Sequence, residues 1–393
     1  MTTNVQWLTN ALLVLPGEEI APGSLLLREG RIAAVNPATV PSGTVIVDCG
    51  GQLLTPGLID LHTHGIERYF YDGSLGPEQF AAAFRALLRY GTTCVVPTLV
   101  PPEKPSLLAP LEVLREQLRG NDGACLAGFH LEGPFVALGG AACPTLPGDV
   151  LLLEELLAAC GGNVRIMSVS PEQPNIVPVI ERLRQEGIQP FLTHTRAGVE
   201  QTQAAIDAGA HHATHFYDVF PVPEERDAGV RPVGAVEAIL ADPRVSVDFI
   251  CDGVHVHPAA IRAALAAKGW EKVLLITDSN IGAGLPSGEY DTPWGYRVRV
   301  RPGEGVRHVS KGFLAGSALT MDEGIRNLMR WLAIPPEQVW AMGTLNPARL
   351  LGLSTKGRIA VGADADLVLW DQELNALKTW VGGRCLFERE NII

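Results

Sequence analysis

Six side chains of the types that bind transition metals stand at the ends of short apolar segments. They begin with a His-x-His pair, and the full set is His62, His64, Glu132, His194, His215 and Asp278. The apolar runs CLAGFHLEG, IQPFLTH and KVLLITD are typical of strands buried on both faces of a parallel sheet. A lone histidine is more often a core or surface residue, but in a parallel barrel the catalytic groups lie at the carboxyl ends of the strands. The set therefore predicts one hydrolytic metal centre.

The ligand types narrow the choice of metal. One residue separates the histidines of the His-x-His pair, so on an extended strand both imidazoles lie on one face and can reach one ion. Imidazole and carboxylate ligands suit zinc or iron, whereas calcium and magnesium sites are built almost wholly from oxygen. We expect Glu132, His194 and His215 to form a three-ligand catalytic site with a position left for water. The pair, together with Asp278, could hold a second ion.

Asp278 is also predicted to move protons. In a hydrolytic reaction water is a weak nucleophile, and a poor leaving group departs more readily once it is protonated. A carboxylate at the centre would take the proton of the attacking water and later deliver it to the leaving group. The alternative is that Asp278, in the sequence TDSN, caps the N-terminus of a helix, as an Asp after a strand often does. Because the other metal-binding side chains are expected nearby, the catalytic role of Asp278 is favoured over the helix cap.

The segments between these residues alternate between strand-like runs and helical patterns. The helical patterns cover residues 77–91, 107–118, 177–187, 199–210, 257–269 and 321–333. Such alternation is typical of βαβ units, while short β-prone pieces occupy both ends of the chain. The sequence thus predicts an α/β fold with a (β/α)8 TIM barrel at residues 55–355. A small β-sandwich would combine residues 1–54 with 356–393, and a hairpin would be inserted at 286–313.

Composition restricts the class of protein and its partners. The chain has 393 residues and a net charge of -12, which argues against affinity for nucleic acid or for an anionic membrane surface. No apolar run approaches the length of about 18 residues that a membrane span needs, and no basic segment precedes the first apolar stretch. We expect a cytoplasmic enzyme with a small-molecule substrate. The seven cysteines lack C-x-x-C spacing, which favours reduced thiols.

Several motifs extend the argument beyond the metal-binding residues. PGLIDLHTHG, HLEGPF, DGVHVHP, LAGSALTMDEGIRNLM and KGRIAVGADADLVLWD resemble motifs of the amidohydrolase superfamily and, within it, of the N-acetylglucosamine-6-phosphate deacetylases. The resemblance covers essentially the whole chain in the right order. It implies a barrel with a split β-sandwich, one or two divalent ions, commonly zinc or iron, and removal of an acetyl group from an amino sugar phosphate.

The same resemblance implies residues that bind the substrate. His255 matches a histidine that contacts substrate, while His257 is predicted to be structural. Asp218 and Val219 stand where the family has Asn and Ala, whose amide groups help to hold the phosphate. A carboxylate pointing inward at this position would repel a phosphate dianion.

Two further positions bear on the substrate. Arg226 matches the arginine that reaches the phosphate across a dimer interface in the family, so a homodimer is implied, and Arg231 is a possible substitute. Cys143 lies where the family has a Gly-Ala-His element, and this glycine-rich stretch could line the site. Its alternative role is that of a small loop residue.

His130, which precedes Glu132 in the same strand, is predicted to be a core residue or to support a ligand, and His211, His212 and His308 are assigned no function.

Two other functions remain open at this point. One is a metal-dependent hydrolase of another N-acyl compound or of a cyclic amide, with a rebuilt substrate pocket. The other is a barrel that binds without catalysing, and it is disfavoured because none of the expected metal ligands is missing.

Overall fold

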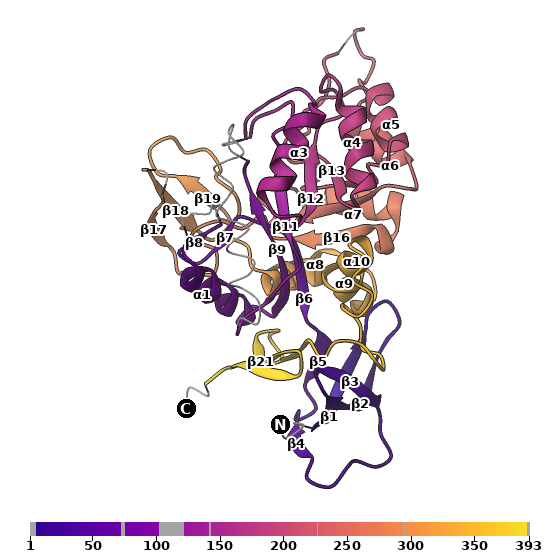
Figure 1. Cartoon of the computed structure of the whole chain (residues 1–393), viewed down its shortest axis with the longest axis vertical. Coiled ribbons are helices and arrows are strands. Elements are labelled where there is room, and N and C mark those ends of the chain that lie inside the picture. The colour runs from indigo at the N-terminus through magenta and orange to yellow at the C-terminus, as the bar shows by residue number, and fades with distance from the viewer. Residues whose placement is uncertain are drawn as a thin grey trace.

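The computed structural model describes residues 5–71, 75–101, 122–140, 143–225, 227–293 and 295–390. Most of them form a parallel barrel surrounded by helices (Figure 1). Its strands are β6 (Leu58–Thr63), β9 (Thr92–Leu99), β10 (Cys125–Leu126), β11 (Phe129–Glu132), β12 (Val164–Val169), β13 (Gln189–Leu192), β14 (His212–Ala213), β15 (Ser246–Ile250) and β16 (Val273–Ile276). β10 and β11 both pair with β9 and together form one interrupted strand, which gives the eight positions of the predicted TIM barrel. The barrel closes where Thr63 forms a parallel bridge with Ser279.

Helices cover the outside of the barrel and connect its strands. They are α1 (Pro77–Leu88), α3 (Val150–Ala159), α4 (Ile176–Gln185), α5 (Val199–Asp207), α6 (Ala235–Ala241), α7 (Pro258–Lys268), α8 (Met321–Trp331), α9 (Pro336–Gly343) and α10 (Leu345–Leu350). In α4 the buried residues are Ile176, Val179, Ile180 and Leu183, the spacing of an apolar stripe that faces a core. The predicted helices are confirmed except for 107–118, which lies outside the described residues.

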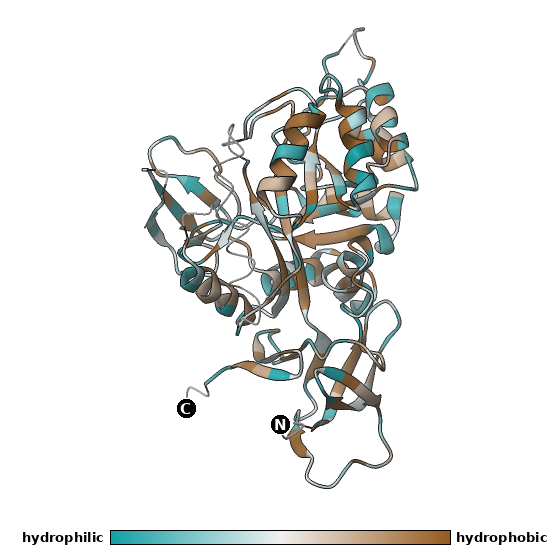
Figure 2. Ribbon diagram, viewed as in Figure 1, coloured by the Kyte–Doolittle hydropathy of each residue, from teal (hydrophilic) through white to brown (hydrophobic). Residues whose placement is uncertain are grey.

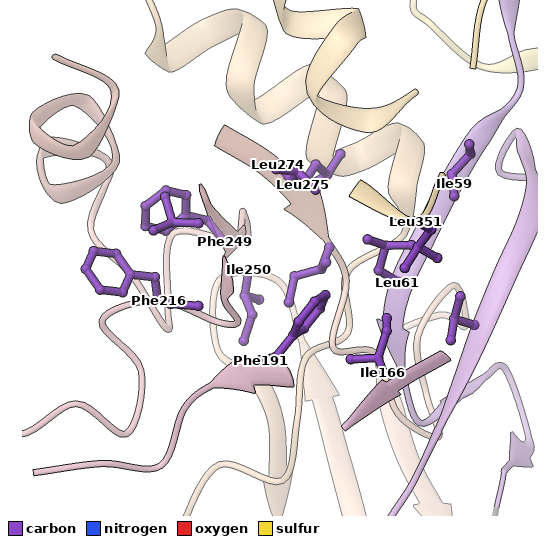
Figure 3. Close-up of a cluster of buried hydrophobic side chains, with 14 of the residues drawn as sticks. Ile59, Leu61, Ile166, Phe191, Phe216, Phe249, Ile250, Leu274, Leu275 and Leu351 are labelled. Atoms are coloured by element: carbon purple, nitrogen blue, oxygen red, sulfur yellow. The ribbon is translucent and has the colours of Figure 1, made fainter. Parts of the chain in front are cut away.

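The barrel strands are buried on both faces, as their apolar runs predict. Every residue of β6 and of β9 is buried, and the strands are mostly brown in Figure 2. Figure 3 shows side chains from several strands in one cluster, among them Ile59, Ile166 and Phe191. Burial of this apolar surface is the main favourable term that holds the strand ends, and so the metal-binding side chains, in fixed positions.

Strands from both ends of the chain pair in a second sheet. It contains β1 (Gln6–Leu15), β2 (Glu19–Arg28), β3 (Arg31–Val35), β4 (Val45–Asp48), β5 (Leu53–Pro56), β20 (Leu367–Trp370), β21 (Ala376–Val381) and β22 (Arg384–Glu388). The two ends meet where β5 pairs with β20 in antiparallel register. The predicted division at residue 55 falls inside β5, and the chain enters the barrel at β6. This sheet lies at the foot of the barrel in Figure 1 and has its own buried core.

The predicted hairpin at 286–313 is wrong in its number of strands. The segment forms a three-stranded antiparallel sheet of β17 (Gly288–Asp291), β18 (Arg297–Arg301) and β19 (Gly305–His308). Both of its turns contain a glycine with positive φ, Gly295 at 77° and Gly303 at 71°, so the chain reverses twice. The remaining short elements are β7 (Gly65–Ile66), β8 (Tyr69–Phe70) and η2 (Trp270–Lys272). None of the helices in the described ranges is long and apolar enough to cross a membrane.

Candidate metal centre

Glu132 lies at the centre of four imidazoles. Its Oε1 is 3.1 Å from Nε2 of His194, 3.3 Å from Nε2 of His215 and 3.5 Å from Nε2 of His62. Its Oε2 is 3.1 Å from Nε2 of His64. All five side chains are buried. One carboxylate therefore faces four ring nitrogens in a space from which bulk water is largely excluded.

Asp278 completes the cluster and lies close to both histidines of the His-x-His pair. Its Oδ1 lies 3.4 Å from Nε2 of His64 and 3.7 Å from Nε2 of His62. The backbone N–H of Asp278 donates to the carbonyl of His62 at 2.8 Å, which fixes the distance between the two strands. All six side chains predicted from the sequence thus meet at one end of the barrel.

The backbone at several of these positions is strained. Glu132 is the last residue of β11, while His194, His215 and Asp278 lie just beyond the ends of β13, β14 and β16. These last three have φ of 49°, 34° and 45°, in the left-handed region that side chains other than glycine rarely adopt. Such conformations persist where the surroundings over-determine them, and they cluster at functional sites. The described chain begins no helix at Asp278, so the alternative of a helix cap is wrong.

The donor set fits a transition metal. Nε2 of His62 is buried and has no hydrogen-bond partner among the described residues, while Nδ1 of the same ring lies 2.9 Å from Oγ1 of Thr214. Ligand atoms of His62, His64 and Asp278 lie within 4.8 Å of one another, as do those of His62, Glu132 and His215. His62 belongs to both groups. A buried nitrogen lone pair without a partner is costly unless a cation or a donor satisfies it, and imidazole with carboxylate suits zinc or iron.

Electrostatics within the cluster favour positive charge. Burial tends to raise the pKa of Glu132, but hydrogen bonds from His194 and His215 outweigh it and hold this pKa well below its usual range. Burial likewise tends to lower the pKa of His215, but the hydrogen bond and charge of Glu132 raise it to about 10. Burial raises the pKa of Asp278 to about 6. The carboxylate of Glu132 thus favours positive charge beside it, which a divalent cation would supply.

The residues implied to contact substrate lie around this cluster, with one outside the described residues. Nδ1 of His255 is 2.7 Å from Oδ2 of Asp252, and the ring is nearly buried. Asp218 is half-buried, and its charge is among the causes that raise the pKa of both His215 and His255, so its carboxylate acts on the site. Val219 follows with a positive φ of 54°. Arg226 lies outside the described residues.

Of two other predicted positions, Cys143 contacts the centre, whereas Arg231 is exposed. Sγ of Cys143 is buried, 3.4 Å from the carbonyl oxygen of Glu132 and 3.7 Å from its Oε2, so this thiol contacts a predicted ligand. Arg231, the proposed substitute for Arg226, is mostly exposed and pairs with Glu237 at 2.9 Å. Arg231 is therefore already engaged by a carboxylate on α6.

Two histidines take the supporting places expected for them. His257 caps α7, where its Nδ1 accepts from the backbone N–H of Ala259. His130 is fully buried between the hydroxyls of Thr98 and Ser168, and burial lowers its pKa to about 3. Its ring centroid lies 4.6 Å from that of His62, so it packs directly against a predicted ligand.

Some polar residues around the centre were not found from the sequence. Asp60 lies buried in β6, two residues before His62, and accepts from Thr277, and burial raises its pKa to about 7. Asp248 is fully buried and accepts from the backbone N–H of His215 at 2.6 Å. The signal that could have found both is a carboxylate inside an otherwise apolar strand, where it must be hydrogen-bonded to be tolerated.

Comparisons with known proteins agree with this fold. The Amidohydrolase family matches residues 53–388. An N-acetylglucosamine-6-phosphate deacetylase of Vibrio furnissii is 34% identical over 369 residues, which cover 91% of this chain and 89% of that protein. An N-acetylgalactosamine-6-phosphate deacetylase of Escherichia coli O157:H7 is 31% identical, with 92% of this chain and 93% of that protein covered.

Solved structures show the same similarity. An N-acetyl-D-glucosamine-6-phosphate deacetylase of Mycobacterium smegmatis, in an aspartate-to-alanine mutant bound to N-acetyl-D-glucosamine-6-phosphate, superposes with a TM-score of 0.86 at 30% identity. The match covers 98% of this chain and 99% of that one. The deacetylase of Pasteurella multocida also gives 0.86, at 26% identity over 97% of this chain and 99% of its own.

Proposed function

The chain belongs to the amidohydrolase family, and from this premise we propose that it removes the acetyl group of N-acetylglucosamine 6-phosphate, or of a closely related N-acetyl amino sugar phosphate. As a member of this family it is a hydrolase that acts on an amide bond. The products would be the amino sugar phosphate and acetate. The observation that carries the proposal is the convergence of four imidazoles and two carboxylates at the ends of the barrel strands.

The chain's own residues supply the remaining chemistry. A divalent metal, when bound, lowers the pKa of water and polarises an acetyl carbonyl. Asp278 faces this space with Oδ1, so its carboxylate can accept the proton of the attacking water and pass it to the leaving nitrogen. His255, oriented by its hydrogen bond to Asp252, would contact the substrate. Glu132, His194 and His215 would hold the metal.

The proposal extends to the metal, the assembly and the location. The donor set of imidazoles and carboxylates supports zinc or iron, and the sharing of His62 between two ligand groups supports one or two ions per chain. A homodimer would bring Arg226 to the substrate of the partner subunit. Gel filtration with light scattering measures the mass of the assembly and so tests for the dimer. We also propose that the protein acts on its phosphorylated substrate in the cytoplasm.

Acetate release tests the substrate assignment directly. We expect purified protein to release acetate from N-acetylglucosamine 6-phosphate, and the unphosphorylated sugar to give a kcat/KM lower by about ten to a hundredfold. Charge-assisted contacts to the phosphate, worth on the order of 1.5 to 3 kcal/mol, are the reason. Acetate release from N-acetylgalactosamine 6-phosphate, compared with release from N-acetylglucosamine 6-phosphate, distinguishes the gluco sugar from the galacto sugar as substrate. Protein stripped of metal by a chelator is the control. No acetate from either phosphorylated sugar would contradict the proposal.

Asp218 favours a second candidate, a hydrolase of another N-acyl compound or of a cyclic amide. Its half-buried carboxylate adds to the larger effects of Glu132 on the pKa of His215 and of Asp252 on the pKa of His255, so its negative charge lies near the centre. Like charges close together in a site of low dielectric constant repel each other by several kcal/mol. A phosphate would therefore need Asp218 to turn away or to be paired with a cation such as Arg226.

Single substitutions at Asp218 and Arg226 separate the two candidates. If the substrate carries a phosphate, Arg226→Ala should raise KM strongly, and Asp218→Asn should leave kcat/KM equal or higher. If the substrate is uncharged or cationic at that end, Asp218 is itself a recognition group. Its loss should then lower kcat/KM by about ten to a hundredfold, the effect of removing one partner of a buried charged hydrogen bond.

Steady-state kinetics with phosphorylated and unphosphorylated N-acetyl sugars supplies the measurement. The wild-type protein, assayed on the same substrates, is the reference for both variants. A strong loss from Asp218→Asn together with no effect of Arg226→Ala would eliminate the phosphate assignment.

A further inference from the structure

A buried aspartate connects two of the predicted metal ligands. Asp248 lies in β15, a strand whose five residues are all buried, and its side chain is fully shielded from solvent. It accepts from Oγ1 of Thr214 at 3.1 Å and from the backbone N–H of His215 at 2.6 Å, both through Oδ1. Its Oδ2 lies 2.8 Å from Nε2 of His212. Three donors therefore satisfy one carboxylate in the barrel interior.

We propose that Asp248 and Thr214 form a positioning relay that fixes the orientation and tautomer of His62, with Nε2 directed at the metal. This inference rests on the proposed function only in that it requires a metal centre. Neither Asp248 nor Thr214 touches the reacting atoms. Both act through His62, and Asp248 also holds the backbone at His215.

The direction of each hydrogen bond follows from the number of protons available. A carboxylate only accepts, so the single hydroxyl proton of Thr214 goes to Asp248. The oxygen of Thr214 can then only accept from Nδ1 of His62, 2.9 Å away. His62 is thereby held with its proton on Nδ1 and a bare lone pair on Nε2. Nε2 is buried without a hydrogen-bond partner among the described residues, and it lies 3.5 Å from Oε1 of Glu132 and 3.7 Å from Oδ1 of Asp278.

The surroundings keep the carboxylate of Asp248 in place. His212 bridges it to Oγ of Ser246, with 2.8 Å from Nδ1 to that hydroxyl. The ring of Phe191, which Figure 3 shows within the barrel cluster, packs on His212 with centroids 4.1 Å apart. Asp248 and His212 are both essentially unexposed. Because close-packed side chains cannot reorient freely, the relay can hold one geometry before the metal arrives.

Removal of the hydroxyl of Thr214 tests the relay. Thr214→Val keeps the shape of the side chain but leaves Nδ1 of His62 without an acceptor, so we expect a zinc affinity lower by about 10 to 100-fold at the ion that His62 binds. This is the usual loss when the partner of a ligating histidine is removed. Thr214→Ser restores the hydroxyl and should stay within a few-fold of the wild-type affinity. Zinc titration in competition with a chromophoric chelator measures the affinity of the wild type and of both variants.

A matched control and a second measurement exclude a general effect on folding. Thr202, in α5, is equally buried and donates to the carbonyl of Gly198, the residue before that helix, so Thr202→Val removes a threonine hydroxyl outside the site and should leave zinc affinity unchanged. ¹⁵N NMR of metal-free protein should show the proton of His62 on Nδ1 in the wild type and not fixed there in Thr214→Val. Wild-type zinc affinity in Thr214→Val, or the same Nδ1–H tautomer in both proteins, would overturn the relay.

The relay and the proposed function fail in different ways. If the wild-type protein releases no acetate but Thr214→Val still weakens zinc binding, the substrate assignment fails and the relay stands. If the wild-type protein is active and Thr214→Val binds zinc as tightly as it does, the relay fails and the function stands.

Discussion

Replacement of His194 by alanine is expected to remove most of the bound metal and most of the activity together. Nε2 of His194 lies 3.1 Å from Oε1 of Glu132, and its Nδ1 lies 2.7 Å from the carbonyl of Leu138, which fixes the ring toward the cluster. An alanine supplies no ligand in its place. Metal content by plasma emission spectroscopy and acetate release, measured on the same preparation, check the result.

A second histidine provides the control for this substitution. His257 is exposed and caps α7, so His257→Ala removes an imidazole without touching the centre and should leave the metal content unchanged. The lost cap costs on the order of 1 kcal/mol of stability, too little to unfold the protein. Full retention of metal in His194→Ala would remove His194 from the centre and contradict the ligand set.

The convergence of the six side chains could be predicted because one rule of architecture applies to all of them. A parallel barrel gathers the carboxyl ends of its strands at one mouth, so residues as far apart in sequence as His62 and Asp278 become neighbours once each is placed at a strand end. The same apolar runs predicted the strands. Helices such as α4 were predicted because their apolar residues recur at helical spacing, whereas α3, VLLLEELLAA, is apolar almost all round and shows no such spacing.

The pairing of residues within the supporting polar network could not be predicted from the sequence. Asp248 and His212 carry no motif, and their pairing depends on the side-by-side register of β14 and β15, which places His212 opposite Ser246. Register depends on tertiary packing rather than on local pattern. The sequence accordingly assigned His212 no function. The third strand at 286–313 was missed because two turn-like segments were counted as one hairpin.

The roles of Asp278 as ligand and as proton carrier make different predictions for Asp278→Asn. The backbone of Asp278 donates to His62 and accepts from Ser317, and both bonds survive the substitution. The side chain keeps its size, so the fold and the metal near Glu132 should be retained. An amide, however, cannot take up the proton of water or return it to the leaving nitrogen.

Turnover of Asp278→Asn should therefore fall by about 10²- to 10⁴-fold at saturating substrate, the usual contribution of a general acid or base. One residue would serve in both steps, so the loss is expected toward the upper end. Metal content and thermal unfolding, measured beside kcat, separate this loss from loss of the ion or of the fold. If metal is retained and kcat falls by less than tenfold, another group carries the proton and Asp278 is only a ligand. If metal and activity disappear in proportion, its principal part is coordination.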